Sequence, residues 1–202
     1  MNDYLMSNMQ LFAKMVANES GHLYRDAWKL SRPPKIYLHW SAGRYNTNYD
    51  DYQISIDGEG QICYNVDSLR DYRPATYKRN TGAISLCLNC AYGATSSNIG
   101  QYPPTTIQIE TISAFCMVAI EILKLDYTKQ HILTHGEAGD NEDGLNTHEQ
   151  YGSHTTCERW DLEYLGNDES PIFQKNIESP KRGGNIIRGK AIWYSNHYGQ
   201  LF

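Results

Sequence analysis

Two histidines near the ends of apolar segments are the side chains best suited to chemistry. His39 lies in the run 35–41, which reads as a strand, and His135 ends the shorter run 131–135. Ends of strands adjoin the loops from which sites are built, so the pair is more informative than either histidine alone. Catalytic zinc sites use three ligands drawn from His, Asp, Glu and Cys and leave a fourth position for water. The pattern therefore predicts a metal site that needs one more ligand.

The third ligand has several candidates after His135. Asp161 lies in an Arg-Trp-Asp-Leu run, whose apolar neighbours mark a return to packed structure after a polar stretch. A metal ligand needs that rigidity, whereas the two histidines of the polar stretch are more simply interpreted as solvated. Spacing alone does not choose among the candidates, which are Glu137, His148, His154, Cys157, Glu158 and Asp161.

Periodicity predicts the elements that position these residues. Apolar residues at spacings of three and four predict a helix over 4–17 and a second one beginning at Thr105 or Thr106. A polar connection over 18–34 has some helical character at 24–30. Strands are expected over 35–41, 83–89 and 131–135, a hairpin over 52–66, a loop over 136–157, a helix start at 159–165 and an amphipathic segment over 186–194. Strands that alternate with helices, together with one hairpin, predict a single α/β domain with a central mixed β-sheet flanked by helices.

Composition excludes several classes of protein. The chain has 202 residues and a net charge of −5, which suits one compact domain and argues against a general nucleic-acid binder. The sequence has no run of about 18 apolar residues, so no transmembrane helix is expected. The first residues lack the pattern of a secretory signal. Five cysteines cannot all pair internally, so reduced thiols and synthesis in a cytoplasm are expected. Cys87 and Cys90 have Cys-x-x-Cys spacing, but without a second pair they are better interpreted as buried strand positions than as a zinc ribbon.

Five segments, in order, resemble the zinc-dependent N-acetylmuramoyl-L-alanine amidases (type 2) of the peptidoglycan recognition protein superfamily, and phage endolysins in particular. The resemblance spans roughly residues 35–165. It implies a catalytic domain there. Outside the resemblance, we expect an N-terminal helical extension over 1–34 packed on that domain and a C-terminal extension over 166–202. The segments are Ile-Tyr-Leu-His-Trp-Ser-Ala-Gly at 36–43, Tyr-Gln-Ile-Ser-Ile-Asp-Gly-Glu-Gly-Gln-Ile at 52–62, Ala-Ile-Ser-Leu-Cys-Leu at 83–88, Ile-Leu-Thr-His-Gly-Glu-Ala at 132–138 and Arg-Trp-Asp at 159–161.

The resemblance also implies roles for individual residues. Zn²⁺ would bind His39, His135 and Asp161, and the Tyr52 hydroxyl would position water or the tetrahedral intermediate. Arg159 stands where many members carry Lys, so it would stabilise an oxyanion but not donate a proton. Cys87 stands where other members carry a catalytic Glu, which favours Tyr52 as the second catalytic group. Aromatic residues that would line the groove for a glycopeptide are Trp40, Tyr45, Tyr49 and Tyr92.

The implied activity is peptidoglycan hydrolysis. Zinc-activated water would cleave the amide bond between the lactyl group of N-acetylmuramic acid and the L-alanine of the stem peptide. Glu137 and Glu158 remain candidates for the donor of a proton to the leaving amine. The expected partner is peptidoglycan, with no nucleic acid and no membrane insertion. The protein is expected to be a monomer that is made in the cytoplasm and reaches the cell wall after holin-type release or lysis.

Three other interpretations stay open. The first is a peptidoglycan-binding module of the same fold that hydrolyses nothing, and the second is a cysteine hydrolase that uses Cys157 or Cys87 with His135. The third is a purely structural zinc site, although such sites usually have four protein ligands. The basic tail over 181–202 is expected to be a solvated terminal helix, or a contact for anionic wall polymers. It would pack through Ile186, Ile187, Ala191, Ile192 and Trp193.

Overall fold

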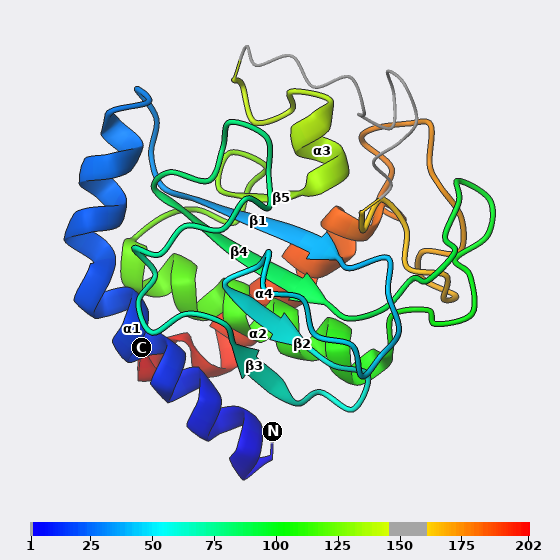
Figure 1. The fold of residues 1–202 in the computed structure, drawn as a ribbon, viewed down its shortest axis with the longest axis horizontal. Coiled ribbons are helices and arrows are strands. Elements are labelled where there is room, and N and C mark those ends of the chain that lie inside the picture. Colours follow the sequence, from blue (N-terminus) through cyan, green and yellow to red (C-terminus); the bar gives the residue numbers. More distant parts are fainter. Residues whose placement is uncertain (1, 146–160) are drawn as a thin grey trace.

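A five-stranded sheet forms the centre of the computed structural model, which describes residues 2–145 and 161–202 (Figure 1). The strand order is β3-β2-β4-β1-β5. β4 pairs in parallel with β1 and β2, β5 pairs in parallel with β1, and β3 pairs antiparallel with β2. The strands are β1 (Lys35–Trp40), β2 (Ile54–Ile56), β3 (Ile62–Tyr64), β4 (Ala83–Leu88) and β5 (Ile132–Thr134). The predicted mixed sheet, including its hairpin, is confirmed.

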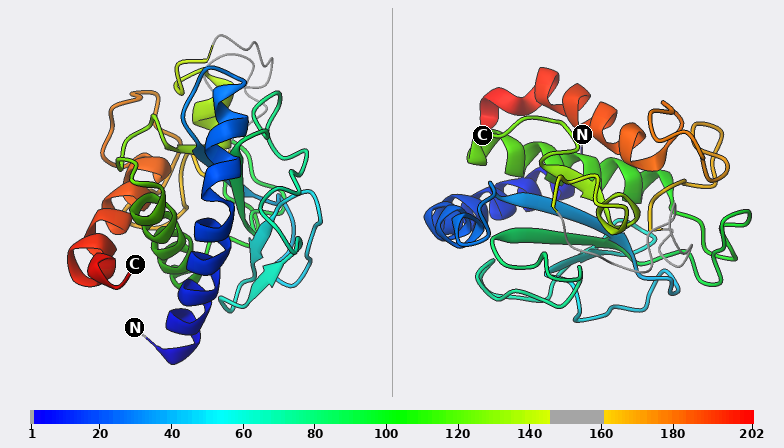
Figure 2. Two further views of the ribbon diagram at one scale, coloured as in Figure 1. Left: turned by 90° about the vertical axis from the view of Figure 1, so that its left-hand side faces the viewer. Right: turned by 90° about the horizontal axis from the view of Figure 1, so that it is seen from above.

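Helices flank this sheet and make it a single α/β domain. Figure 2 shows α2 between the sheet and α4, and α2 also packs against α1. The helices are α1 (Asp3–Trp28), α2 (Thr106–Leu123), α3 (His135–Gly139) and α4 (Gly183–Tyr198), with a short 3-10 helix, η1 (Gly199–Leu201), after α4. The predicted cap of α2 is Thr105, which forms a capping box with Gln108.

α2 is the core helix of the domain. Its length and apolar composition would also suit a membrane span, but 72% of this segment is buried inside the fold. The packing of this helix against α1, α4 and the sheet accounts for its apolar character. The core that it organises includes Met9 and Phe12 of α1 and Ile187 of α4.

The two faces of the sheet have different chemistry. On β1, Ile36, Leu38 and Trp40 belong to the core shared with α2. Because side chains alternate along a strand, Tyr37 and His39 lie on the opposite face. That second face is where β1 contributes polar groups.

Three local predictions are wrong. α1 continues to Trp28, through most of the expected connection, because Leu23 and Ala27 extend its buried face. His135 does not end a strand but begins α3, which Thr134 caps. The segment after Asp161 is a turn rather than a helix start.

Candidate metal centre

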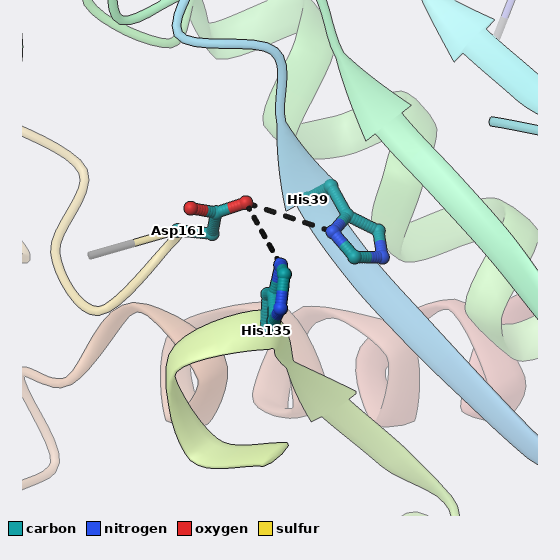
Figure 3. Close-up of side chains that lie close together, drawn as sticks. All are labelled: His39, His135 and Asp161. Carbon is teal, nitrogen blue, oxygen red and sulfur yellow. Dashed lines mark ion pairs between the residues drawn. The ribbon is translucent and has the colours of Figure 1, made fainter. Parts of the chain in front are cut away.

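His39, His135 and Asp161 come together on the polar face of the sheet (Figure 3). The Oδ2 atom of Asp161 lies 3.6 Å from Nδ1 of His39 and 3.5 Å from Nδ1 of His135. One ligand atom from each residue lies within 4.8 Å of the other two. Among the described residues, no other group of His, Cys, Asp and Glu has this arrangement.

The pairing of β1 with β5 explains why the two histidines meet. Leu38 lies opposite Thr134 in the parallel register, so the residue that follows each of them is a histidine at the same level of the sheet. Parallel strands end at one edge, where loops and helix starts can bring further groups. Asp161 reaches this edge from the segment that precedes α4.

Thr76 orients the first histidine. Its Oγ1 lies 3.1 Å from Nε2 of His39, and both side chains are buried. Since Nδ1 faces Asp161, the arrangement suits the tautomer whose Nε2–H donates to Thr76 and whose Nδ1 lone pair is available to a metal. The connection that carries Thr76 is itself anchored, because Nε of Arg79 lies 2.7 Å from Oδ2 of Asp143.

The donor set fits a zinc ion. Two imidazoles and one carboxylate are ligands that Zn²⁺ favours, and three protein ligands are typical of its catalytic sites. Ligand atoms about 2.0–2.1 Å from a tetrahedral zinc ion lie about 3.4 Å from one another. The separations of 3.5 and 3.6 Å between Asp161 and the two histidines are close to that spacing.

The charge state of Asp161 also suits a ligand. Burial by itself would raise its pKa, but the neighbouring imidazoles of His135 and His39 outweigh burial and hold the pKa below its ordinary value. The carboxylate is therefore ionised at neutral pH, as a metal ligand must be.

Tyr52 lies next to this group. Its ring centroid is 5.0 Å from that of His39, and its hydroxyl is hydrogen-bonded to Cys87. Burial raises the pKa of Tyr52 well above its ordinary value, so the hydroxyl stays protonated and can donate a hydrogen bond. Burial also raises the pKa of Cys87, which makes this thiol a poor nucleophile and argues against its use in a cysteine hydrolase.

The predicted groove residues do not all lie where a substrate could reach them. Tyr92 is exposed, and the guanidinium of Arg44 lies 5.5 Å from its ring centroid. Tyr49 is half-buried. Tyr45 is also half-buried, and its hydroxyl donates to the carbonyl of Pro103 at 2.7 Å. Trp40 belongs to the core on the opposite face of the sheet, so its predicted role in substrate binding has no support in the structure.

Glu137 does not fit the role of a proton donor. It is fully buried, and Arg188 holds it with two hydrogen bonds of 2.7 and 2.8 Å. Burial would raise the pKa of Glu137, but the charge of Arg188 outweighs this and lowers it. This carboxylate stays ionised and supports the structure around His135.

Several predicted residues lie outside the described part of the chain. Arg159, for which an oxyanion role is expected, is one of them. The others are His148, His154, Cys157 and Glu158.

Other functional contacts are absent from the sequence prediction. Thr76 lies in the irregular connection between β3 and β4, and no periodicity or spacing singles it out. Tyr102 makes an edge contact with Tyr45 and extends the aromatic group near Tyr92. The tyrosine-rich composition is the sequence feature that could have pointed to Tyr102 as part of this aromatic group.

The basic tail also differs from expectation. Arg182 and Arg188 are buried in ion pairs rather than solvated. Ile192 and Trp193, which were expected to pack, are exposed on α4.

Comparison with known proteins adds no family assignment. The chain matches no protein-family model and no curated protein sequence. What stands is an α/β protein with a mixed five-stranded sheet and a buried His-His-Asp group that can hold a metal ion.

Proposed function

We propose that the protein is a zinc-dependent amidase that cleaves peptidoglycan between the lactyl group of N-acetylmuramic acid and L-alanine. The observation that carries the proposal is the convergence of His39, His135 and Asp161, whose ligand atoms lie within 4.8 Å of one another. The substrate is taken from the sequence resemblance. The resemblance is used here because the three zinc ligands that it implies are the three residues that converge. Three protein ligands leave a coordination position open, as hydrolysis requires.

The residues of the chain would divide the chemistry among them. His39, His135 and Asp161 would hold Zn²⁺, with Thr76 keeping the His39 ring in its ligating orientation. The chemistry that Zn²⁺ supplies when bound in such a site is polarisation of a carbonyl and acidification of a water molecule to a pKa of about 7.

Tyr52 would act on the developing negative charge of the substrate. Its hydroxyl is protonated at all working pH values, and its ring lies against His39. A preorganised donor beside the reacting carbonyl stabilises the oxyanion, and removing one such donor typically slows a reaction about 100- to 1,000-fold. Arg159 would be a second donor of this kind.

Metal content and wall digestion test the proposal together. Purified protein is expected to carry about one zinc ion per chain, and chelation is expected to stop the release of stem peptide from cell walls. His39→Ala should lose both zinc and activity, whereas His197→Ala, which removes an exposed histidine of α4, should keep both. Full activity of His39→Ala would overturn the assignment.

The same experiment separates the open alternatives. A peptidoglycan-binding module would retain walls without releasing peptide. A cysteine hydrolase would keep its activity after chelation and lose it after thiol alkylation. A structural zinc site would unfold on chelation and leave walls intact.

A further inference from the structure

Two buried carboxylates occupy equivalent positions after two of the candidate ligands. Glu137 comes two residues after His135, and Glu163 comes two residues after Asp161. Both side chains are fully buried, and both face the start of α4. Buried carboxylates need partners, and these partners come from α4 and the residue before it.

Arg182, the residue before α4, joins the segments that carry these carboxylates. Its Nε donates to Oε2 of Glu163 at 2.8 Å, and its Nη1 lies 3.8 Å from Oε1 of Glu137. Its two terminal nitrogens also contact Glu142, at 2.9 and 2.7 Å. A planar guanidinium can span several carboxylates in this way, which a lysine ammonium cannot.

Thr134 connects the same two carboxylates on the other side. Its hydroxyl donates to Oε1 of Glu163 at 3.0 Å, and its backbone N–H donates to Oε2 of Glu137 at 2.9 Å. Thr134 directly precedes His135, so the network reaches the backbone of a candidate ligand. The segment of His135 and the segment of Asp161 are therefore linked twice, by Thr134 and by Arg182.

The segment of Asp161 needs such support. Leu162 has a φ of 57°, in the left-handed region that a leucine rarely adopts. Such backbone persists only where the surroundings determine it. Here the Gly183 N–H donates to the Glu163 carbonyl at 3.0 Å. A Cβ on Gly183 would lie 2.1 Å from the Leu162 carbonyl oxygen, so α4 begins in direct contact with this strained turn.

The carboxylates also have little room to move. A Cβ on Gly136 would lie 2.5 Å from Oε1 of Glu163, and a Cβ on Gly184 would lie 2.7 Å from Oε1 of Glu137. Glycine at these two positions lets each carboxylate approach the neighbouring backbone closely. Loss of a positive charge that pairs with these carboxylates would therefore move the backbone rather than the carboxylates alone.

We propose that Arg182 is a positioning residue for the metal centre: by bridging Glu163 and Glu137, it fixes Asp161 relative to His135. The start of α4, beyond the part of the chain that resembles the amidases, would thus set the geometry of two of the three ligands. This inference rests on the proposed metal site but not on the substrate or the reaction. Without the guanidinium, the buried carboxylates would repel one another, and the Asp161 turn would relax away from His135.

Metal binding by Arg182 variants tests the proposal. The variants are Arg182→Met, which removes the charge, and Arg182→Lys, which keeps the charge but loses the planar guanidinium that spans several carboxylates. The matched control is Lys190→Met, because Lys190 lies on α4 and pairs with Glu110 and Glu169 instead of the ligand segments. Zinc affinity is measured by competition with a chelator, and the visible spectrum of the Co²⁺-loaded protein reports ligand geometry. Circular dichroism establishes that each variant is folded at the working temperature.

The expected result is a loss of zinc affinity of about 10- to 100-fold in Arg182→Met, with an altered Co²⁺ spectrum. Arg182→Lys should show a smaller loss in the same direction, and Lys190→Met should match the wild type. If Arg182→Met does not fold, Arg182→Lys serves as the test variant. A folded variant with the zinc affinity and the Co²⁺ spectrum of the wild type would overturn the proposal. A wild-type protein that binds neither zinc nor Co²⁺ would instead refute the metal site itself, and the positioning role with it.

Discussion

Replacing Thr76 by valine isolates one hydrogen bond to a candidate metal ligand. Valine keeps the shape of threonine but lacks the hydroxyl whose Oγ1 lies 3.1 Å from Nε2 of His39. The backbone N–H of Thr76 still donates to Asn80, and Arg79 still pairs with Asp143, so the connection should keep its position. The change therefore acts on the orientation and tautomer of His39 rather than on the fold.

The expected effect is a 10- to 100-fold weaker affinity for Zn²⁺, or about 1.4 to 2.8 kcal/mol of binding free energy. Buried His39 would lose the acceptor for its Nε2–H, and the tautomer that presents Nδ1 to the metal would lose its preference. Competition with a chelator of known affinity measures the change. Thr76→Ser restores the hydroxyl and should recover most of the affinity.

A control variant separates this effect from a general loss of stability. Thr111→Val makes the same change in a buried residue of α2, on the other side of the sheet from the metal centre, and should leave zinc affinity unchanged. Wild-type zinc affinity in Thr76→Val would refute the view that Thr76 orients His39. A loss of affinity in Thr76→Ser equal to that in the valine variant would refute it as well.

Two further predictions concern catalysis and pH. Tyr52→Phe should lower the rate of stem-peptide release about 100-fold while zinc content stays the same, because only a hydrogen-bond donor to the oxyanion is removed. An unchanged rate would exclude Tyr52 from catalysis. Burial lowers the pKa of Lys35 to about 8, from an ordinary value of 10.5. Between these two values the unfolded chain binds more protons, so this lysine should make the free energy of unfolding rise with pH. Urea unfolding from pH 7 to 10.5 should show that rise in the wild type and not in Lys35→Met; parallel curves would contradict it.

The sheet and the histidine pair were predictable because they depend on local patterns. Strand periodicity indicated β1 and the β2–β3 hairpin, and two histidines after apolar runs indicated a common edge. Alternation along β1 also contained a signal that the prediction did not use. If His39 faces the site, its neighbour Trp40 must face the core, as the structure shows.

The supporting contacts could not be predicted, because they join residues that are far apart in the sequence. Thr76 meets His39 from the connection between β3 and β4, and Arg182 meets Glu163 and Glu137 from the start of α4. The sequence shows a basic tail, but only the packing of α4 reveals that two of its arginines are buried among carboxylates. An arginine in solvent and an arginine in a buried ion pair are the same letter in the sequence.

The products of peptidoglycan digestion test the central claim most directly. Mass spectrometry of walls treated with the zinc-loaded protein should find stem peptides that begin with a free L-alanine amine, together with glycan that carries a free lactyl carboxylate. Both products should disappear in His39→Ala. Walls that remain uncut, or a cut within the stem peptide, would contradict the proposed activity.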